Sequence, residues 1–199
     1  MLDRPAQPSD IHDFFGSLFV CYSLYMDYKI ESGIKETDLP EWLQSAAKKW
    51  GIFDDKRVNY KDADIAPIVM CTMVCRDELL LVKRGYGLAD ANGYWSTVNG
   101  FIDEIKPVYE QVIQEVKEEL SVDINKTMIK VRESYTLKNP REKRSYIVFP
   151  CLVSLNTKPS IILDSENTEY AWTKRAKLNE YYTLNDLPYA IDSALGIRP

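Results

Sequence analysis

The first quarter of the chain carries hydrophobic residues at the spacing of an amphipathic α-helix. In a first run they lie three or four positions apart: Ile11, Phe14, Phe15, Leu18, Phe19, Tyr22, Tyr25, Met26 and Ile30. Gly33 is a suitable end for this helix. A second run begins with a capping sequence at residues 38–41 and ends at Gly51. The pattern predicts a helical hairpin over residues 9–51.

The hydrophobic pattern changes near residue 65 from helical spacing to strands. Runs rich in Val, Ile, Met and Tyr predict strands over residues 65–76, 79–83, 94–98, 128–137, 145–155 and 170–172. A turn is predicted at Asp77-Glu78, and the strand over residues 94–98 is expected to end in Asn99-Gly100. Apolar residues at helical spacing predict further helices over residues 107–120 and 186–195. This order predicts an α/β (α+β) fold in which helices pack against a sheet.

The change in pattern also suggests a division of the chain. Residues 52–64 are polar and have no periodic pattern, so we interpret them as a linker. We therefore expect an N-terminal helical extension and linker over residues 1–60 and a second domain over residues 61–199. The aromatic stripe of the first helix suits packing on the neighbouring domain, and a membrane-surface or dimer face is the alternative.

Charge and composition exclude several classes of function. The formal net charge is −5, so no broad basic surface for nucleic acid is expected. The four cysteines form no CxxC pair and the chain has one histidine, which argues against a zinc site. The longest apolar stretch, residues 14–26, is too short to span a membrane, and no signal-peptide cleavage site follows it. We therefore expect a cytoplasmic protein without membrane contact.

Three glutamates carry the candidate chemistry. Glu115, Glu118 and Glu119 are spaced i, i+3, i+4, so their carboxylates lie on one side of the predicted helix, away from its apolar face. Three anions this close repel one another unless a cation neutralises them. Oxygen ligands favour a hard divalent ion, with magnesium as the first choice and manganese as the alternative. The competing interpretation is a solvated acidic helix face.

The segment around these glutamates resembles the Nudix box of the Nudix hydrolase family. It reads GFIDEIKPVYEQVIQEVKEELSV from Gly100 to Val122. The family's box reads Gly, five residues, Glu, seven residues, Arg-Glu, an apolar residue, any residue, Glu-Glu, any residue, Gly and an apolar residue. The matching positions are Gly100, Glu115, Val116, Glu118, Glu119 and Val122. The resemblance covers about residues 65–197 and implies a Nudix-like α/β/α sandwich with a mixed β-sheet, preceded by the helical hairpin.

Three positions depart from the family's pattern, so the box is degenerate. Lys106 replaces the first Glu, Gln114 replaces the Arg and Ser121 replaces the last Gly. In the family the Glu and the Arg are thought to pair and to brace the loop against the helix. Losing one partner strands a charge, whereas losing both together can be nearly neutral. We expect a replaced brace, with Asp103 or Glu104 as a partner for Lys106, and a conformational cost at Ser121 if its φ is positive.

The resemblance implies a metal-dependent hydrolase that cleaves the diphosphate of a nucleoside diphosphate linked to another moiety. All three glutamates carry over as candidate catalytic and metal-binding residues. Glu115 and Glu119 correspond to direct ligands, and Glu118 to a ligand or to the group that orients or deprotonates the water. The substrate-binding candidates are Lys83, Arg84 and Gly100. The implied partner is a small-molecule nucleoside diphosphate derivative, and a homodimer is compatible with the resemblance and with the aromatic stripe.

The sequence leaves several roles open. Glu166 or Glu169 is a candidate general base, because the position of the base varies within the family. We interpret the basic stretch over residues 138–144 as a solvated loop, with contact to substrate or to a partner subunit as the alternative. Three aromatic residues near the box are core residues or stack on a base or sugar: Tyr86, Tyr94 and Trp95. The altered box also allows a non-catalytic Nudix-like nucleotide-binding or regulatory module, and nothing favours a prenyl-diphosphate isomerase of the same fold.

Overall fold

The computed structural model describes residues 29–86, 92–138, 144–184 and 186–197, which combine one sheet with several helices. The strands are β1 (Lys29–Ser32), β2 (Ile65–Cys75), β3 (Glu78–Arg84), β4 (Trp95–Ser96), β5 (Val98–Phe101), β6 (Ile129–Val131), β7 (Tyr135–Lys138), β8 (Ser145–Leu155) and β9 (Asn167–Thr173). The α-helices are α2 (Leu39–Trp50), α3 (Val108–Leu120) and α4 (Leu187–Leu195). Short 3-10 helices are η2 (Glu36–Asp38), η3 (Lys126–Met128) and η4 (Arg175–Glu180).

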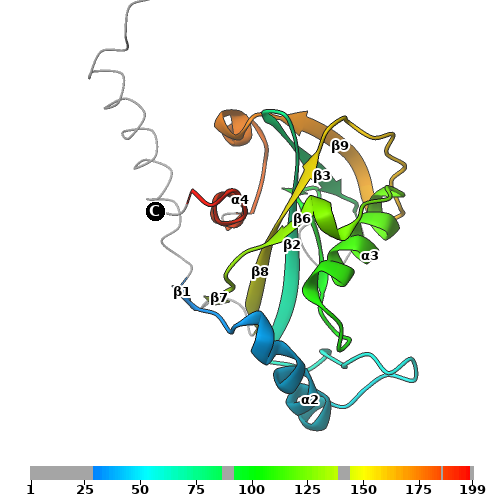
Figure 1. The fold of residues 1–199 in the computed structure, drawn as a ribbon, viewed down its shortest axis with the longest axis vertical. Coiled ribbons are helices and arrows are strands. Elements are labelled where there is room, and N and C mark those ends of the chain that lie inside the picture. Colours follow the sequence, from blue (N-terminus) through cyan, green and yellow to red (C-terminus); the bar gives the residue numbers. More distant parts are fainter. Residues whose placement is uncertain (1–28, 87–91, 139–143, 185, 198–199) are drawn as a thin grey trace, which may run out of the picture.

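The nine strands form a mixed sheet with helices on both faces (Figure 1). The order along the sheet is β1-β7-β8-β2-β3-β4, with β5 beside β2, β6 beside β8 and β9 beside β3. Helix α3 lies on one face and α4 on the other. The predicted α/β/α sandwich is confirmed by this arrangement. None of the described helices has the length and hydrophobicity needed to cross a lipid bilayer.

A parallel pair of long strands, β2 and β8, forms the middle of the sheet. The two strands keep one register along all of β2, and both are covered by helices, which explains their nearly continuous hydrophobic sequence. Cys71 and Cys151 lie opposite each other in this pair, and Cys75 ends β2. All three thiols are buried and free, as expected of small core residues.

Two apolar cores fix the helices on the sheet. On the α3 face, four residues at helical spacing are fully buried: Val108, Val112, Val116 and Leu120. Because neighbouring residues of a strand point to opposite faces, Val69 of β2 joins this core while Met70 joins the core under α4. Burial of one complete face of α3 therefore sets the direction of its opposite face.

The predicted helical hairpin is correct in its second half and wrong at the end of its first helix. Helix α2 confirms the second run, whereas residues 29–32 form β1, which pairs with the edge strand β7. Pairing satisfies the backbone groups of that edge, and this tertiary contact overrides the local helical spacing. Gly33 does not end a helix. A Cβ there would lie 2.0 Å from Ser134 Oγ, so the glycine permits a close crossing of two chain segments. The prediction over residues 9–28 lies outside the described residues.

Other predicted boundaries move because of sheet pairing. Asn99-Gly100 does not end a strand but lies inside β5, opposite Met70 and Val69 of β2. The predicted strand over residues 128–137 is interrupted after β6, where the Arg132 backbone N–H bonds to Pro150 O. The first hairpin turn comes one residue earlier than predicted, at Arg76, whose φ is 58°. The predicted helices over residues 107–120 and 186–195 are confirmed as α3 and α4.

The polar segment before the sheet is packed against the rest of the structure. Val58, Tyr60 and Ala63 are buried in the same core as α2 and α3. The Tyr60 hydroxyl donates to Ile102 O at 2.8 Å, and the Val58 backbone N–H donates to Asp103 O at 2.9 Å. Helix α2 is thus tied to the loop before α3, and the proposed domain division at residue 60 stays a prediction.

Ser121 ends α3 in the left-handed conformation, with φ 56° and ψ 28°. The side chain is exposed, so glycine can replace it without loss of packing. We expect Ser121→Gly to raise the free energy of unfolding by about 0.5–1 kcal/mol, measured by urea denaturation, because glycine adopts this conformation without the steric cost of a Cβ. The matched control is Ser45→Gly inside α2, which should lower stability by about 0.5 kcal/mol. If both substitutions changed the free energy of unfolding in the same direction, this explanation would be contradicted.

Candidate active site

Glu119 is a buried carboxylate held by donors from two strands. Only 7% of the residue is exposed. Its Oε1 accepts from the backbone N–H of Asn99 in β5 at 3.2 Å, and its Oε2 accepts from Asn167 Nδ2 at the start of β9 at 2.9 Å. The carboxylate therefore lies where α3, β5 and β9 meet, and its orientation is fixed by all three elements.

Glu115 lies one turn earlier on α3, against the backbone of β5. A Cβ built on Gly100 would lie 1.9 Å from Glu115 Oε1, so only glycine leaves room for this carboxylate. Gln111, one further turn back, donates from Nε2 to Glu115 Oε1 at 2.6 Å. The structure thus brings Gly100 and Glu115 together, while contact between Gly100 and a substrate stays a prediction.

The two carboxylates are destabilised in their ionised forms. Burial, opposed by the Gln111 hydrogen bond and reinforced by repulsion from Glu118, raises the pKa of Glu115 to about 7. Burial and repulsion from Glu115, opposed by the hydrogen bonds from Asn99 and Asn167, raise the pKa of Glu119 to about 8. Among the described residues, neither carboxylate forms an ion pair with a lysine or arginine. The surroundings therefore favour the protonated forms of both carboxylates, and Lys106 opposes this only as a weaker influence on Glu115.

The geometry only partly matches a three-carboxylate metal site. Glu118, unlike Glu115 and Glu119, is exposed and accepts a hydrogen bond from Gln114 Nε2 at 2.9 Å. Within the described ranges, no group of three or more His, Cys, Asp or Glu side chains is arranged to hold a metal ion. One buried and one half-buried carboxylate, neither in an ion pair, are nevertheless the oxygen donors that a hard divalent cation prefers. The residues present fit such a cation through Glu115 and Glu119.

The expected replacement for the family's brace is present, and it uses the two substituted positions themselves. Lys106 Nζ donates to Gln114 Oε1 through a short hydrogen bond, and to Glu104 Oε2 at 3.0 Å. Gln114 in turn donates to Glu118. Of the two partners expected for Lys106, Glu104 is correct, and Asp103 instead lies 3.6 Å from an Arg57 nitrogen. The loop remains connected to α3, with the cation now on the loop.

Lys83 and Arg84, predicted to bind substrate, lie on opposite faces of β3, because neighbouring strand residues alternate. Lys83 faces the α4 side, where its Nζ lies 2.7 Å from Glu169 Oε1. Arg84 faces the α3 side, opposite Asn167 in the β3–β9 ladder, with Nη2 4.0 Å from Glu166 Oε2. The structure brings Arg84, but not Lys83, to the side that carries the buried carboxylates. Substrate contact stays a prediction for both.

Two residues of the site were not predicted from the sequence. Asn167, which binds Glu119, is 48 positions away in the sequence, and only the pairing of β9 with β3 brings it to α3. Gln111 carries a detectable signal, because it lies four residues before Glu115 on the same helical face. Asn167 lies between the two candidate bases, Glu166 and Glu169, each of which is paired with a cation of β3. Their role as a base stays a prediction.

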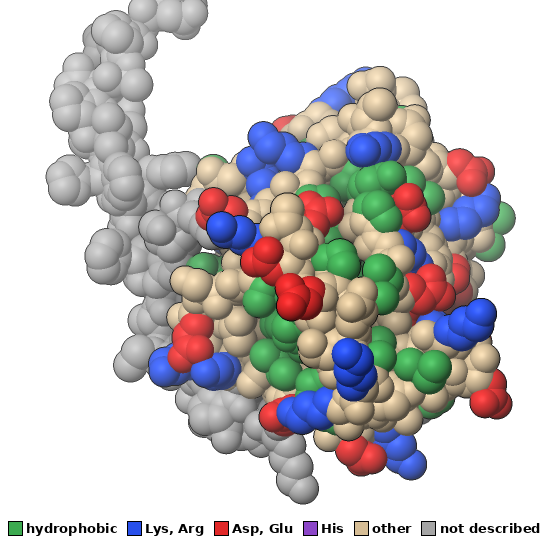
Figure 2. Space-filling model, turned by 60° about the horizontal axis from the view of Figure 1, so that its bottom comes forward, with side chains coloured by type: hydrophobic (Ala, Val, Ile, Leu, Met, Phe, Trp, Pro, Cys, Tyr) green, Lys and Arg blue, Asp and Glu red, His purple; other side chains and the backbone are tan. Residues whose placement is uncertain are grey.

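The basic stretch over residues 138–144 is represented in the described structure by its two ends. Lys138 Nζ lies 2.6 Å from Glu31 Oε2 across the β1–β7 pair. Arg144 binds backbone carbonyls of residues 60, 61 and 63. Acidic and basic side chains are interspersed on the described part of the face in Figure 2.

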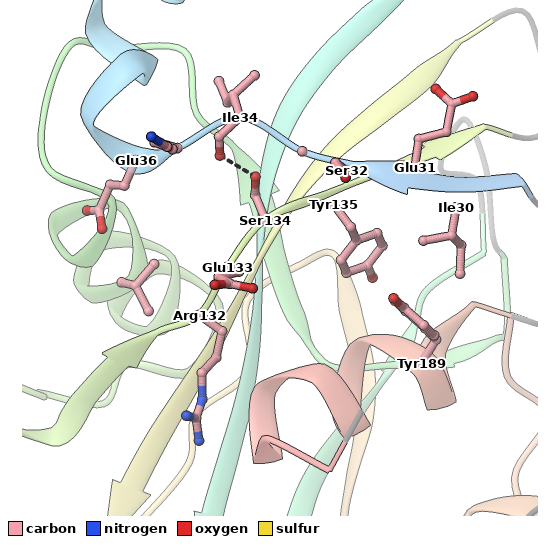
Figure 3. A pocket seen from close by; sticks show the side chains of 13 residues that line it. Ile30, Glu31, Ser32, Ile34, Glu36, Arg132, Glu133, Ser134, Tyr135 and Tyr189 are labelled. Atoms are coloured by element: carbon pink, nitrogen blue, oxygen red, sulfur yellow. Dashed lines mark hydrogen bonds between the residues drawn. The ribbon is translucent and has the colours of Figure 1, made fainter. Parts of the chain in front are cut away.

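A separate groove of about 660 Å³ lies away from the box carboxylates (Figure 3). It runs between β1, the connection from β6 to β7, and α4, and its walls include Tyr135 and Tyr189. Those two rings meet edge to face at 4.8 Å. Arg132, also in its lining, binds Ala194 O at the end of α4 at 2.9 Å. Because this groove contains none of the predicted site residues, the carboxylate cluster remains the candidate active site.

The raised pKa values predict a pH-dependent stability in the presence of a chelator. Glu119 ionises near pH 4.5 when exposed in the unfolded chain and at about 8 when folded. Between these two pH values Glu119 keeps its proton in the folded state but loses it in the unfolded state. The contribution of Glu119 to the free energy of unfolding is therefore fully present below pH 4.5 and is lost as the pH rises to about 8. We expect Glu119→Gln to become progressively more stable than the wild type between pH 5 and 8.5, measured by thermal unfolding. Glu118→Gln, at an exposed position, should follow the wild-type profile, and a constant difference for Glu119→Gln would contradict the prediction.

The Lys106–Gln114 contact predicts strong coupling between the two positions. Lys106→Glu alone places a carboxylate beside Glu104, and Gln114→Arg alone places a guanidinium beside Lys106. The double variant restores an acid–arginine pair, so it should regain about 1 kcal/mol or more of the summed losses in unfolding free energy. Urea denaturation of the four proteins measures this coupling. Lys158→Glu, combined with Gln114→Arg, is the control and should be additive, since Lys158 pairs with Glu78. Additive changes in both cycles would show that the Lys106–Gln114 contact contributes nothing to the free energy of unfolding.

Sequence comparison with known families gives a match to the NUDIX domain over residues 65–192. This segment runs from the start of β2 into α4, so it contains the whole candidate site. Comparison with curated proteins gives no sequence match.

Solved structures of the same fold are similar to the chain at low sequence identity. The NUDIX domain of Shewanella oneidensis NrtR, complexed with ADP ribose, is 16% identical with a TM-score of 0.55, over 66% of this chain and 86% of that chain. The MutT protein of Methanosarcina mazei Go1 is 18% identical with a TM-score of 0.53, over 64% and 93%. A bifunctional NMN adenylyltransferase/ADP ribose pyrophosphatase from Francisella tularensis, complexed with AMP and a Mn ion, is 16% identical with a TM-score of 0.53, over 80% and 46%. With the match over residues 65–192, the chain belongs to the NUDIX domain family.

Proposed function

We propose that the protein is a metal-dependent Nudix pyrophosphohydrolase that cleaves the diphosphate of a nucleoside diphosphate linked to another moiety. The observation that carries this proposal is a pair of carboxylates against β5, buried Glu119 and half-buried Glu115, neither of which forms an ion pair with a lysine or arginine among the described residues. Carboxyl groups whose pKa values are strongly shifted by their surroundings are typical of functional sites. Family membership supports hydrolysis, and the ADP ribose, AMP and Mn ion in the similar structures support a nucleotide-type substrate and a divalent metal.

In the proposed reaction Glu115 and Glu119 hold the divalent cation, magnesium or manganese, with their carboxylate oxygens. When bound, that cation neutralises diphosphate oxygens and polarises a water molecule. Arg84, on the same face of the sheet, binds a phosphate oxygen with its guanidinium. Glu118 is exposed and bonded only to the neutral amide of Gln114 among the contacts described, so it is free to take a proton from the attacking water.

The second candidate is a non-catalytic nucleotide-binding module. The arrangement of Glu118 favours it, because this carboxylate is held by Gln114 outside the cluster formed by Glu115 and Glu119. Such a module binds a nucleotide, seen as thermal stabilisation, and releases no product. The two candidates differ in one further respect: nucleotide binding by the module should survive replacement of all three glutamates by Gln.

Two single variants separate the roles in the proposed site. Glu118→Gln should lower turnover by about 100-fold or more and leave manganese affinity near the wild-type value, because it loses proton transfer. Glu119→Gln should weaken manganese binding itself, since it removes one anion of the buried pair. Product release is measured by chromatography over a panel of nucleoside diphosphate derivatives with magnesium or manganese, and metal affinity by titration. Wild-type protein that binds metal and nucleotide but turns over no compound of the panel would favour the binding module.

A further inference from the structure

Two tyrosines form an exposed stacked pair at one edge of the sheet. Tyr94, just before β4, and Tyr182, after η4, have ring centroids 4.2 Å apart with planes inclined by 28°. Their hydroxyls are 2.7 Å apart, so each ring is held in place by the other. Tyr182 is 68% exposed. An ordered aromatic surface facing solvent is an unusual use of two large side chains.

The residues next in sequence pack differently from the stacked pair. Trp95 and Tyr181 are neighbours of Tyr94 and Tyr182, and their rings meet edge to face at 5.1 Å. Both pack against the core under α4. The same two chain segments therefore place one aromatic pair against the core under α4 and leave the other pair with half-buried Tyr94 and exposed Tyr182. Core packing explains Trp95, as one of the sequence interpretations expected, but it does not explain Tyr94.

The stacked pair lies on the face of the sheet that carries the carboxylates. The register of β3 with β4 pairs Lys83 with Trp95, and the Arg84 backbone N–H bonds to Tyr94 O at 2.9 Å. Tyr94 is thus opposite Arg84, and opposed residues of a ladder point to the same face. On the other side of Arg84 lies Asn167, whose amide binds Glu119.

One row of side chains therefore crosses three neighbouring strands. Stacked rings come first, then the Arg84 guanidinium, then the Asn167 amide bound to Glu119. Two strand spacings, roughly 10 Å, separate the aromatic end from the end with the carboxylate. A nucleotide has the same order of parts, with a flat base, a sugar and then phosphates. Aromatic rings stack on every base because each base has a π-face.

We propose that the exposed Tyr94–Tyr182 pair is the subsite that stacks on the aromatic base of the substrate, with the phosphates directed past Arg84. The inference rests on the proposed function, because it extends the same site. One of the two hydroxyls donates its proton to the other, so this bond holds the rings in place and the pair presents a ring face to the base. This subsite selects substrates that carry a base over sugar phosphates that lack one.

The test compares the binding of AMP with that of ribose 5-phosphate to the full chain, by calorimetry in the presence of magnesium. Wild-type protein should bind AMP more tightly, and Tyr182→Leu should weaken AMP binding by about 5- to 100-fold while leaving ribose 5-phosphate unchanged. Tyr182→Phe keeps the ring and should retain most of the AMP affinity. Phe53→Leu, at an exposed aromatic residue in the loop after α2, is the control for loss of a surface ring and should change neither affinity.

Two results would overturn the subsite. One is equal affinity of the wild type for AMP and ribose 5-phosphate, and the other is an equal loss of both in Tyr182→Leu. Neither measurement requires turnover, so the subsite is tested separately from hydrolysis. Selective loss of AMP binding in a protein that cleaves no substrate would support the subsite and reject the hydrolase. Hydrolysis of base-free sugar diphosphates as fast as of nucleotide derivatives would reject the subsite and retain the hydrolase.

Discussion

The placement of two carboxylates, one buried and one half-buried, beside one backbone segment is the constraint on which the rest of the site depends. Burial raises the free energy of the ionised form of both Glu115 and Glu119, and repulsion from Glu115 adds to this effect at Glu119. Such a pair does not stabilise the fold. It persists only where the surrounding structure fixes its position more strongly than repulsion and desolvation oppose it. The arrangement of α3, β5 and β9 is best understood as the means of holding this pair.

Each of these elements contributes a different part of the restraint. The fully buried face of α3 fixes the rotation of the helix, so the carboxylates of Glu115 and Glu119 cannot turn away without exposing the core. Strand β5 supplies a position without a side chain at Gly100 and a backbone donor at Asn99. Strand β9 supplies the amide of Asn167. These donors reduce the cost of burying the carboxylates, and none of them is a cation, so a bound cation would shift both groups toward their ionised forms.

The parts of the site that could be predicted from the sequence are those that depend on neighbouring residues along the chain. Helix α3, the spacing of its glutamates and the positive φ at Ser121 depend on neighbours within one turn, and local patterns report such features well. The position of Asn167 beside Glu119 depends on the register of β9 against β3, and this register shifts between Lys83 and Arg84. No local pattern records that irregularity, so the contact of Asn167 with Glu119 could not be inferred. The separation of Lys83 from Arg84 follows from strand alternation alone. Strand β1 was missed for a related reason, because pairing with β7 outweighs helical spacing.

The contact between Lys106 and Gln114 changes how the degenerate box should be understood. A box that is decaying would leave the loop before α3 and the helix without a polar contact, since the two substitutions would occur independently. Here the substituted side chains bond to each other, while Glu104 neutralises the lysine within the loop. These contacts fix the orientation of the Gln114 amide. Its carbonyl oxygen accepts from the Lys106 ammonium group, so its N–H groups point toward Glu118. A bond from a neutral amide holds a carboxylate less tightly than a charged donor does. The altered box thus keeps the loop attached to the helix and leaves Glu118 easier to release toward a bound cation or water.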